Sequence, residues 1–186
     1  MKILLNLPFK IHKKKTMNKP ILIYWPKSGN VEHAAKLIAK EYGDIISLPL
    51  DKVTQDTLYQ YNNFIVGGST VGAETWQETK NDSPWSTFFA SLKKIDFSNK
   101  KVALFGLGDQ ILWPANFVDG LRTVYNAFIE ANAQLIGKWP TKGYDFTESL
   151  AVKDGFFVGL ALDEDQQDEH TEERVKTWVS QIKKEF

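Results

Sequence analysis

A short apolar run, Ile21–Trp25, leads directly into a turn-forming segment at residues 26–30, and a helical pattern begins at Val31. A buried strand that feeds the N-terminus of a helix leaves several peptide N–H groups without acceptors, and the positive end of the helix dipole lies behind them. Such a turn is suited to binding anions, phosphate groups above all. Small polar residues also join strands to helices in most α/β folds, so this feature gains weight only from the rest of the chain.

Three residues of the turn suit contact with an anion. Gly29 allows the backbone to approach a ligand closely, and the Ser28 hydroxyl can donate to an oxyanion. Asn30 tolerates turn conformations and can cap the following helix. The segment is therefore a candidate phosphate site.

The rest of the chain alternates short apolar runs with amphipathic stretches, the pattern of a parallel sheet flanked by helices. We expect further strands at 45–48, 64–66, 102–105 and 134–137, the last resuming at 158–162 after an irregular aromatic stretch at 139–157. Expected helices cover 31–42, 55–61, 85–94 and 115–132, and Thr171 is expected to cap a final helix. The predicted fold class is α/β.

Glycine-bearing loops at 26–30, 67–83 and 106–114 share one property, because each follows the carboxyl end of an expected strand. In an open parallel sheet, such loops lie on one edge and form the crevice where ligands bind. The polar stretch 69–83 is also longer than most loops of compact domains, which favours a binding role. The sequence therefore predicts one pocket built from three loops.

Charge is distributed unevenly along the chain. The totals are 23 basic and 23 acidic residues, but residues 1–16 hold five lysines and no acidic residue, so 18 basic residues face 23 acidic ones from Met17 onward. This acidic body argues against nucleic acid as a partner. We expect residues 1–19 to be a basic, disordered extension ahead of a single domain at 20–186, with a basic docking tail as the alternative.

Several kinds of chemistry are excluded by the sequence. There is no cysteine for a disulfide, a thiolate metal site or a nucleophile, and the three histidines are scattered. No apolar run approaches the ~18 residues of a membrane span, and residues 1–16 make a poor signal peptide, so we expect a cytoplasmic protein. The carboxylates between 163 and 173 indicate a solvated acidic rim rather than a metal site. With no catalytic residue predicted, any chemistry would come from a cofactor.

Three segments resemble the flavodoxins, in particular the long-chain branch whose fifth strand is split by an insertion. They are residues 102–110 (VALFGLGDQ), 139–146 (WPTKGYDF) and 157–165 (FVGLALDED), within a resemblance that covers about residues 20–186. The resemblance implies a three-layer sandwich around a five-stranded parallel sheet in the order 2-1-3-4-5. It also implies one non-covalently bound FMN where the strand order reverses.

The resemblance further implies which residues hold FMN, loop by loop. The phosphate loop corresponds to Pro26, Lys27, Ser28, Gly29, Asn30 and Val31, and the loop over one ring face to Ser69, Thr70, Val71 and Gly72. The loop at the flavin edge corresponds to Leu107, Gly108 and Asp109, followed by Trp113 at the position of a ring-stacking tyrosine. Asn116 and Asp165 match positions that reach the flavin and its ribityl chain. Gly72 also matches the peptide whose carbonyl turns toward flavin N5 on reduction.

The chain departs from the family pattern at three positions. Pro26 and Val31 stand where the family carries hydroxyl residues, and Pro26 lacks a peptide N–H. Lys27 could compensate with a positive charge, or it could simply be an exposed lysine. Val71 replaces a ring-stacking tryptophan, a loss of ~0.5–1.5 kcal/mol beyond area burial. Trp76 could fold back to replace that contact, or it could pack within its own loop.

The implied function is a low-potential one-electron carrier that uses FMN to shuttle electrons between redox proteins, a reductase and an acceptor, and is not itself an enzyme. An acidic rim would steer partners with basic docking surfaces, and we expect a monomer. One alternative is an FMN-dependent NAD(P)H:quinone-type reductase, compatible with an open ring face at Val71. The other is a fold relative that has lost FMN, which Pro26 and Val31 suggest.

Overall fold

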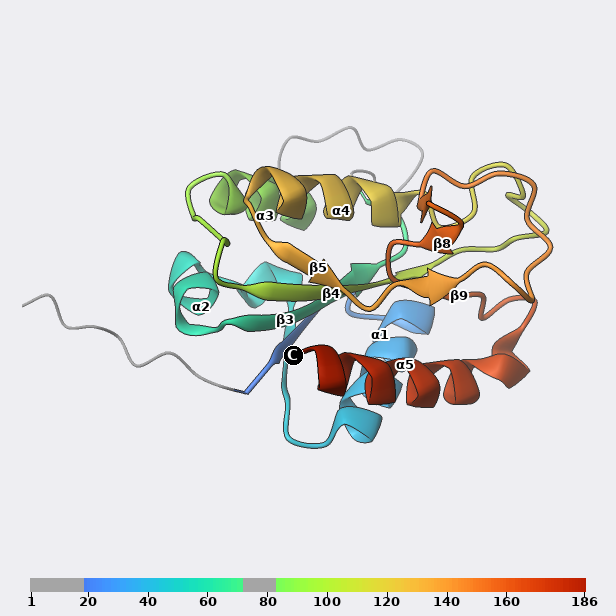
Figure 1. The fold of residues 1–186 in the computed structure, drawn as a ribbon, viewed down its shortest axis with the longest axis horizontal. Helices are drawn as coiled ribbons and strands as arrows, with labels where there is room; N and C mark the ends of the chain where they lie inside the picture. The colour runs from blue at the N-terminus through green and yellow to red at the C-terminus, as the bar shows by residue number, and fades with distance from the viewer. Residues whose placement is uncertain (1–18, 72–82) are drawn as a thin grey trace, which may run out of the picture.

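The computed structural model describes residues 19–71 and 83–186, and its centre is a parallel sheet (Figure 1). The strands follow the order β2-β1-β3-β4-β5, with β9 also paired to β4. Their bounds are β1 (Ile21–Trp25), β2 (Ile46–Pro49), β3 (Asn63–Gly68), β4 (Lys101–Leu107), β5 (Gln134–Ile136) and β9 (Leu160–Leu162). The predicted strand order and the split fifth strand are both confirmed, since β5 and β9 pair with successive parts of β4.

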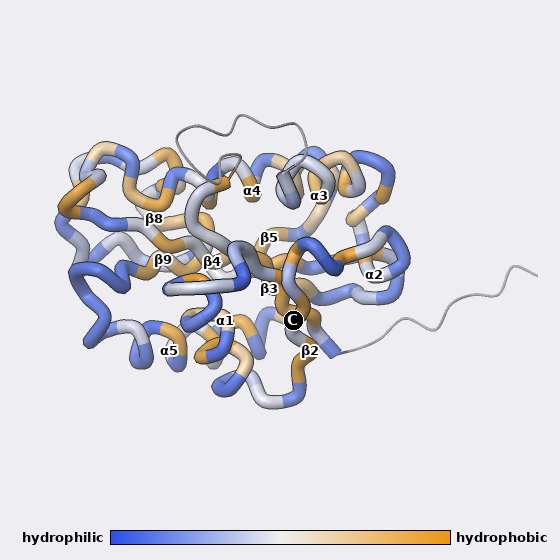
Figure 2. The backbone as a smooth tube through the Cα atoms, turned by 180° about the vertical axis from the view of Figure 1, so that it is seen from behind, coloured by the Kyte–Doolittle hydropathy of each residue, from blue (hydrophilic) through white to orange (hydrophobic). Residues whose placement is uncertain are grey.

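Helices cover both faces of the sheet and make the outer layers of a sandwich. Figure 1 shows α1 (Gly29–Tyr42) and α5 (Thr171–Glu185) on one face, and α3 (Pro84–Leu92) and α4 (Gly120–Glu130) on the other. Two short elements, η1 (Leu50–Lys52) and α2 (Gln55–Gln60), connect β2 to β3. Apolar residues concentrate in the strands and on the inner helix faces, as the orange segments of Figure 2 show. Among the described helices, none combines the length and apolarity that crossing a bilayer requires.

The segment between β5 and β9 forms a second, smaller sheet. Its antiparallel strands are β6 (Trp139–Pro140), β7 (Val152–Lys153) and β8 (Phe156–Phe157), in the order β6-β8-β7. The ring of Phe157 in β8 packs against those of Phe117, Tyr144 and Phe146, with ring centroids 5.2–5.8 Å apart. The expected irregular stretch is therefore wrong in part. Contacts among these aromatic rings stabilise strands of only two residues. Strands this short show no alternation of apolar and polar residues in the sequence, so the pattern did not predict them.

Several helix boundaries differ from the sequence prediction, and two of the differences, at the starts of α4 and α5, have a clear structural cause. The helix expected at 115–132 begins only at Gly120, because Val118 has φ +50° and the residues before it form turns. A β-branched residue in this region is a backbone outlier that no helical pattern reveals. Thr171 does not cap α5: it is the first helical residue, and its hydroxyl donates to Glu164.

Candidate cofactor site

The carboxyl ends of four strands meet at one edge of the sheet. Trp25 is in register with Gly68, and Gly68 with Gly106. On the other side of β4, Leu107 is in register with Leu162. The three predicted loops and the segment after β9 therefore start from neighbouring positions on the edge where parallel sheets bind ligands.

The first loop presents the start of α1. Ser28 is the N-cap residue with an extended backbone (φ −159°), and its side chain makes no capping hydrogen bond. Gly29 has φ +60°, a conformation that strains any residue with a Cβ. Asn30 lies inside the helix, so the prediction that it acts as a cap is wrong. All three residues are exposed, and the side chain of Ser28 leaves the first peptide N–H groups of α1 uncapped.

The side chains of two residues in this loop, Lys27 and Val31, make contacts within the protein. Lys27 Nζ lies 2.5 Å from Asp51 Oδ2 and 5.5 Å from the centroid of the Trp25 ring. The hydrogen bond from Lys27 holds the pKa of Asp51 below its ordinary value. Neither sequence alternative for Lys27 anticipated this ion pair. The Val31 side chain is buried in the core, so only its peptide N–H can serve an anion.

The second loop packs against the start of α4. A Cβ added to Gly120 would lie 2.5 Å from the Ser69 carbonyl oxygen and 3.1 Å from Val71 Cγ2. Ser69 and Val71 are half-buried, and Thr70 is exposed. Sequence reasoning missed Gly120, because a glycine at a helix start gives no sign of what packs on it. The predicted contacts at Gly72 and Trp76 lie outside the described residues.

The third loop is a turn closed by Asp109. Its Oδ1 accepts hydrogen bonds from the peptide N–H groups of Ile111 (2.9 Å) and Leu112 (2.8 Å). Gly108 donates its N–H to the Leu162 carbonyl at 3.1 Å, directly after the buried Leu107 at the end of β4. The Trp113 N–H donates to the Asp109 carbonyl at 2.9 Å, and the Trp113 side chain is 45% exposed. The turn that follows the end of β4 therefore carries a partly exposed aromatic residue.

The last two predicted residues lie on adjoining segments. The Asn116 side-chain amide donates to Asp119 Oδ2 at 3.0 Å, and its peptide N–H donates to the Trp113 carbonyl at 3.0 Å. Asp165 is exposed after β9, and its peptide N–H donates to Asp163 Oδ1 at 3.2 Å. The Asn116 side chain is thus engaged within its own loop, whereas the Asp165 side chain faces solvent.

The acidic rim is smaller than the sequence suggests. Asp163 is completely buried, and Glu164 pairs with His33 Nδ1 at 3.0 Å while accepting the Thr171 hydroxyl. The carboxylates exposed beyond them are Asp165, Asp168, Glu169, Glu172 and Glu173. Over residues 19–71 and 83–186, no three histidine or carboxylate side chains converge as metal ligands.

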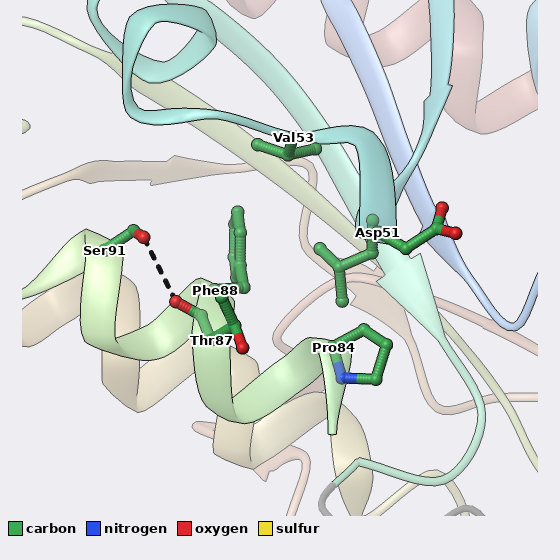
Figure 3. A pocket seen from close by; sticks show the side chains of 7 residues that line it. Asp51, Val53, Pro84, Thr87, Phe88 and Ser91 are labelled. Carbon is green, nitrogen blue, oxygen red and sulfur yellow. Dashed lines mark hydrogen bonds between the residues drawn. The ribbon is translucent and has the colours of Figure 1, made fainter. Parts of the chain in front are cut away.

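A cavity of about 200 Å³ lies between η1 and α3 (Figure 3). It is lined by Leu50, Asp51, Val53, Pro84, Thr87, Phe88 and Ser91. The Ser91 hydroxyl is committed to the Thr87 carbonyl at 3.1 Å. None of the predicted site residues lines the cavity, although Asp51 connects it to Lys27.

Comparison with known proteins identifies the family, since the sequence model of the flavodoxins matches residues 22–178. This chain belongs to the flavodoxin family. A flavodoxin from Synechocystis sp. is 45% identical over 170 residues, which cover 90% of this chain and 97% of the relative. A flavodoxin from Nostoc sp. strain PCC 7120 is 37% identical over 171 residues, covering 91% and 99%. The crystal structure of Fusobacterium nucleatum flavodoxin bound to flavin mononucleotide matches with a TM-score of 0.79 at 27% identity, covering 91% of this chain and 99% of that one.

The residues of this flavodoxin edge fit a phosphorylated flavin. An exposed helix N-terminus that the Ser28 side chain does not cap supplies peptide N–H and hydroxyl donors of the kind that a phosphate dianion accepts. The close packing at Gly120 brings the second loop near α4, and the third loop adds an exposed indole for a planar ring. Pro26 removes one donor, and the remaining peptide groups of the loop keep theirs.

The Asp109 turn of this flavodoxin should open in acid. The hydrogen bond from the peptide N–H of Leu112 holds the pKa of Asp109 below its ordinary value. Hydrogen bonds from the Ile111 N–H and the Gln166 side-chain amide act in the same direction. A depressed carboxyl pKa stabilises the fold above the unfolded pKa, and this contribution disappears as the pH falls through the folded pKa. The NMR shift of the Leu112 amide should therefore titrate with a midpoint below about 3.9. The Asp109→Asn variant should lose this titration while Asp145→Asn keeps it, and a wild-type midpoint at or above the ordinary value would contradict the turn.

Proposed function

We propose that this flavodoxin holds FMN at the edge formed by its three loops and the segment after β9, and carries single electrons between two redox proteins. The observation that carries the proposal is the uncapped start of α1. It follows β1, and the end of β1 is in register with the ends of β3 and β4, from which the second and third loops start. FMN supplies the redox chemistry when it is bound, and the chain binds it, orients it and excludes water from it. Membership of the flavodoxin family favours this carrier over the reductase and the FMN-free relative.

Each loop has its own task in this proposal. The Ser28 hydroxyl and the N–H groups at 29–31 bind the phosphate, and Pro26 and Lys27 shape that loop. Residues 69–71, with Gly72 and Trp76, cover one ring face, and Trp113 covers the other. Leu107, Gly108 and Asp109 border the ring edge, while Asn116 and Asp165 reach toward the ribityl chain.

The docking surface in this proposal is the exposed acidic group after β9. Its five carboxylates occupy the segment 165–173, directly beyond the strand whose end borders the site. We infer partners with basic docking surfaces, since charge complementarity raises association rates. A monomer acting in the cytoplasm, with a domain at 20–186 and a separate extension at 1–19, completes the proposal.

The test combines binding and electron transfer. Apo-protein should bind one FMN in calorimetry and in a visible-absorbance titration. The loaded protein should then be required for electron flow from an NADPH-dependent flavoprotein reductase to cytochrome c. Oxidation of NAD(P)H by the loaded protein alone would support the reductase instead, and an absence of FMN binding would support the relative that has lost its cofactor.

Trp113 should determine the emission of bound flavin. Its side chain is 45% exposed beside the third loop, and a stacked indole quenches flavin fluorescence. Trp113→Ala should raise the fluorescence of bound FMN and weaken binding by about 0.5–1.5 kcal/mol through loss of stacking. Trp139→Phe is the control, because Trp139 is buried in the insertion and its indole N–H donates a hydrogen bond to the Tyr144 hydroxyl. Unchanged emission in Trp113→Ala would mean that another group covers this ring face.

A further inference from the structure

A buried carboxylate lies beneath the third loop. Asp163, the residue after β9, has no exposed surface. Its Oδ2 accepts the peptide N–H of Gln110 at 3.0 Å, and its Oδ1 accepts those of Asp165 at 3.2 Å and Gln166 at 3.0 Å. In the part of the chain that the structure describes, peptide groups rather than a salt bridge satisfy this charge. A buried charge is tolerated only when it is bonded in this way, so its three partners are held firmly in place.

A second set of hydrogen bonds joins the same two segments. The Gln166 side-chain amide lies 3.2 Å from each carboxylate oxygen of Asp109, the residue that closes the third loop. The Gly108 N–H adds a backbone hydrogen bond to Leu162 at 3.1 Å. The loop that precedes Trp113 is therefore fixed to the segment after β9 at three successive points, Gly108, Asp109 and Gln110.

The segment after β9 is itself anchored to the helix that starts at the phosphate loop. Glu164 accepts the Thr171 hydroxyl of α5 and pairs with His33 of α1 at 3.0 Å. His33 lies one helical turn after Gly29. Asp163 and Glu164 thus stand between two loops that, under the proposed function, hold opposite ends of the same ligand.

We propose that Asp163, assisted by Gln166, is the positioning residue for the flavin ring, a role that rests on the proposed function. Asp163 acts through the Gln110 N–H: it fixes the turn that carries Gly108, Asp109 and Trp113, without touching the ligand. Its buried negative charge also opposes the addition of an electron nearby, because electrostatic interactions are weakly screened away from water. One carboxylate therefore sets the shape of the ring site and lowers its reduction potential.

The test uses Asp163→Asn, which keeps the side-chain volume but replaces one acceptor oxygen by a donor that faces a peptide N–H. Without the hydrogen bond from Gln110 the third loop is less ordered in the apo-protein, and ordering it when the ligand binds should cost about tenfold in affinity. The dissociation constants of FMN and riboflavin should therefore rise by the same factor, about tenfold, because the change acts on the ring and not on the phosphate. The reduction potential of bound FMN should rise. In apo-protein, the Gln110 amide should exchange its hydrogen at least tenfold faster, by hydrogen-exchange NMR.

Asp154→Asn is the matched control, since it removes the same charge from an exposed position between β7 and β8 and should change none of these quantities. If wild-type protein bound neither flavin, the proposed function would fail, and the positioning role would fall with it. If wild-type bound both and Asp163→Asn matched it in affinity and potential, the positioning role alone would be overturned. Should Asp163→Asn not fold, Gln166→Ala decides: an equal, smaller loss for FMN and riboflavin supports the role, and no loss overturns it.

Discussion

Gly67→Ala is expected to lower the free energy of unfolding by about 3 kcal/mol or more, at or beyond the upper end of ordinary overpacking penalties. Gly67 is buried in β3 opposite Phe105 of β4. A Cβ there would lie 2.2 Å from the Phe105 carbonyl oxygen and 2.3 Å from its ring Cδ1. Neither group can yield easily, because both belong to β4, a strand that is paired on both sides. The melting temperature should fall by roughly 6–12 °C for a chain of this size.

The matched control is Gly143→Ala, measured by the same denaturant and thermal melts. Gly143 has φ +93° and no atom within 4 Å of an added Cβ, so the change should cost only backbone strain, about 1 kcal/mol. If Gly67→Ala lost no more stability than Gly143→Ala, the close approach of β3 and β4 at Phe105 would be refuted. The same variant would shift the end of β3, from which the second loop starts.

The central sheet could be predicted from sequence because each strand is an apolar run that ends at a turn-forming residue. Ile21–Trp25 agrees at both ends, and the split fifth strand is recovered on either side of its insertion. The start of α4 could not be predicted, since it depends on the positive φ of Val118. The insertion sheet depends on rings such as Phe117 and Phe157, which are 40 residues apart in sequence and pack edge to face.

For the candidate site, the loops could be predicted from the sequence, but the long-range side-chain contacts could not. Gly29 and Gly108 stand out because they follow the ends of predicted strands. Loops that follow the carboxyl ends of parallel strands lie on one edge of the sheet, so their place in the sequence is enough to bring them to one site. Asp163 was recognised only as one member of an acidic cluster, because its partner Gln110 lies 53 residues away. The pairing of Lys27 with Asp51 was missed for the same reason. Sequence patterns locate the loops of this site, and long-range hydrogen bonds decide which side chains are free to meet a ligand.

FMN is expected to bind at least 100-fold more tightly than riboflavin, which lacks only the phosphate. The uncapped start of α1 offers the Ser28 hydroxyl and peptide N–H groups to a dianion, with the positive end of the helix dipole behind them. A hydrogen bond to a charged group contributes about 1.5–3 kcal/mol, so two of them correspond to roughly 100-fold to 10,000-fold in affinity. Calorimetric titration of apo-protein with both ligands measures this ratio directly.

Ser28→Ala should remove one of these hydrogen bonds and weaken FMN by about 1.5–3 kcal/mol, while riboflavin binding stays the same. Because the Ser28 side chain makes no capping hydrogen bond, its removal should leave the free energy of unfolding of the apo-protein unchanged. Ser47→Ala, on an exposed strand position of β2, is the control and should alter neither affinity. A loss that is equal for FMN and riboflavin would place Ser28 at the ring instead of the phosphate. This pattern is the opposite of the one expected for Asp163→Asn, so the two variants together separate the two ends of the ligand.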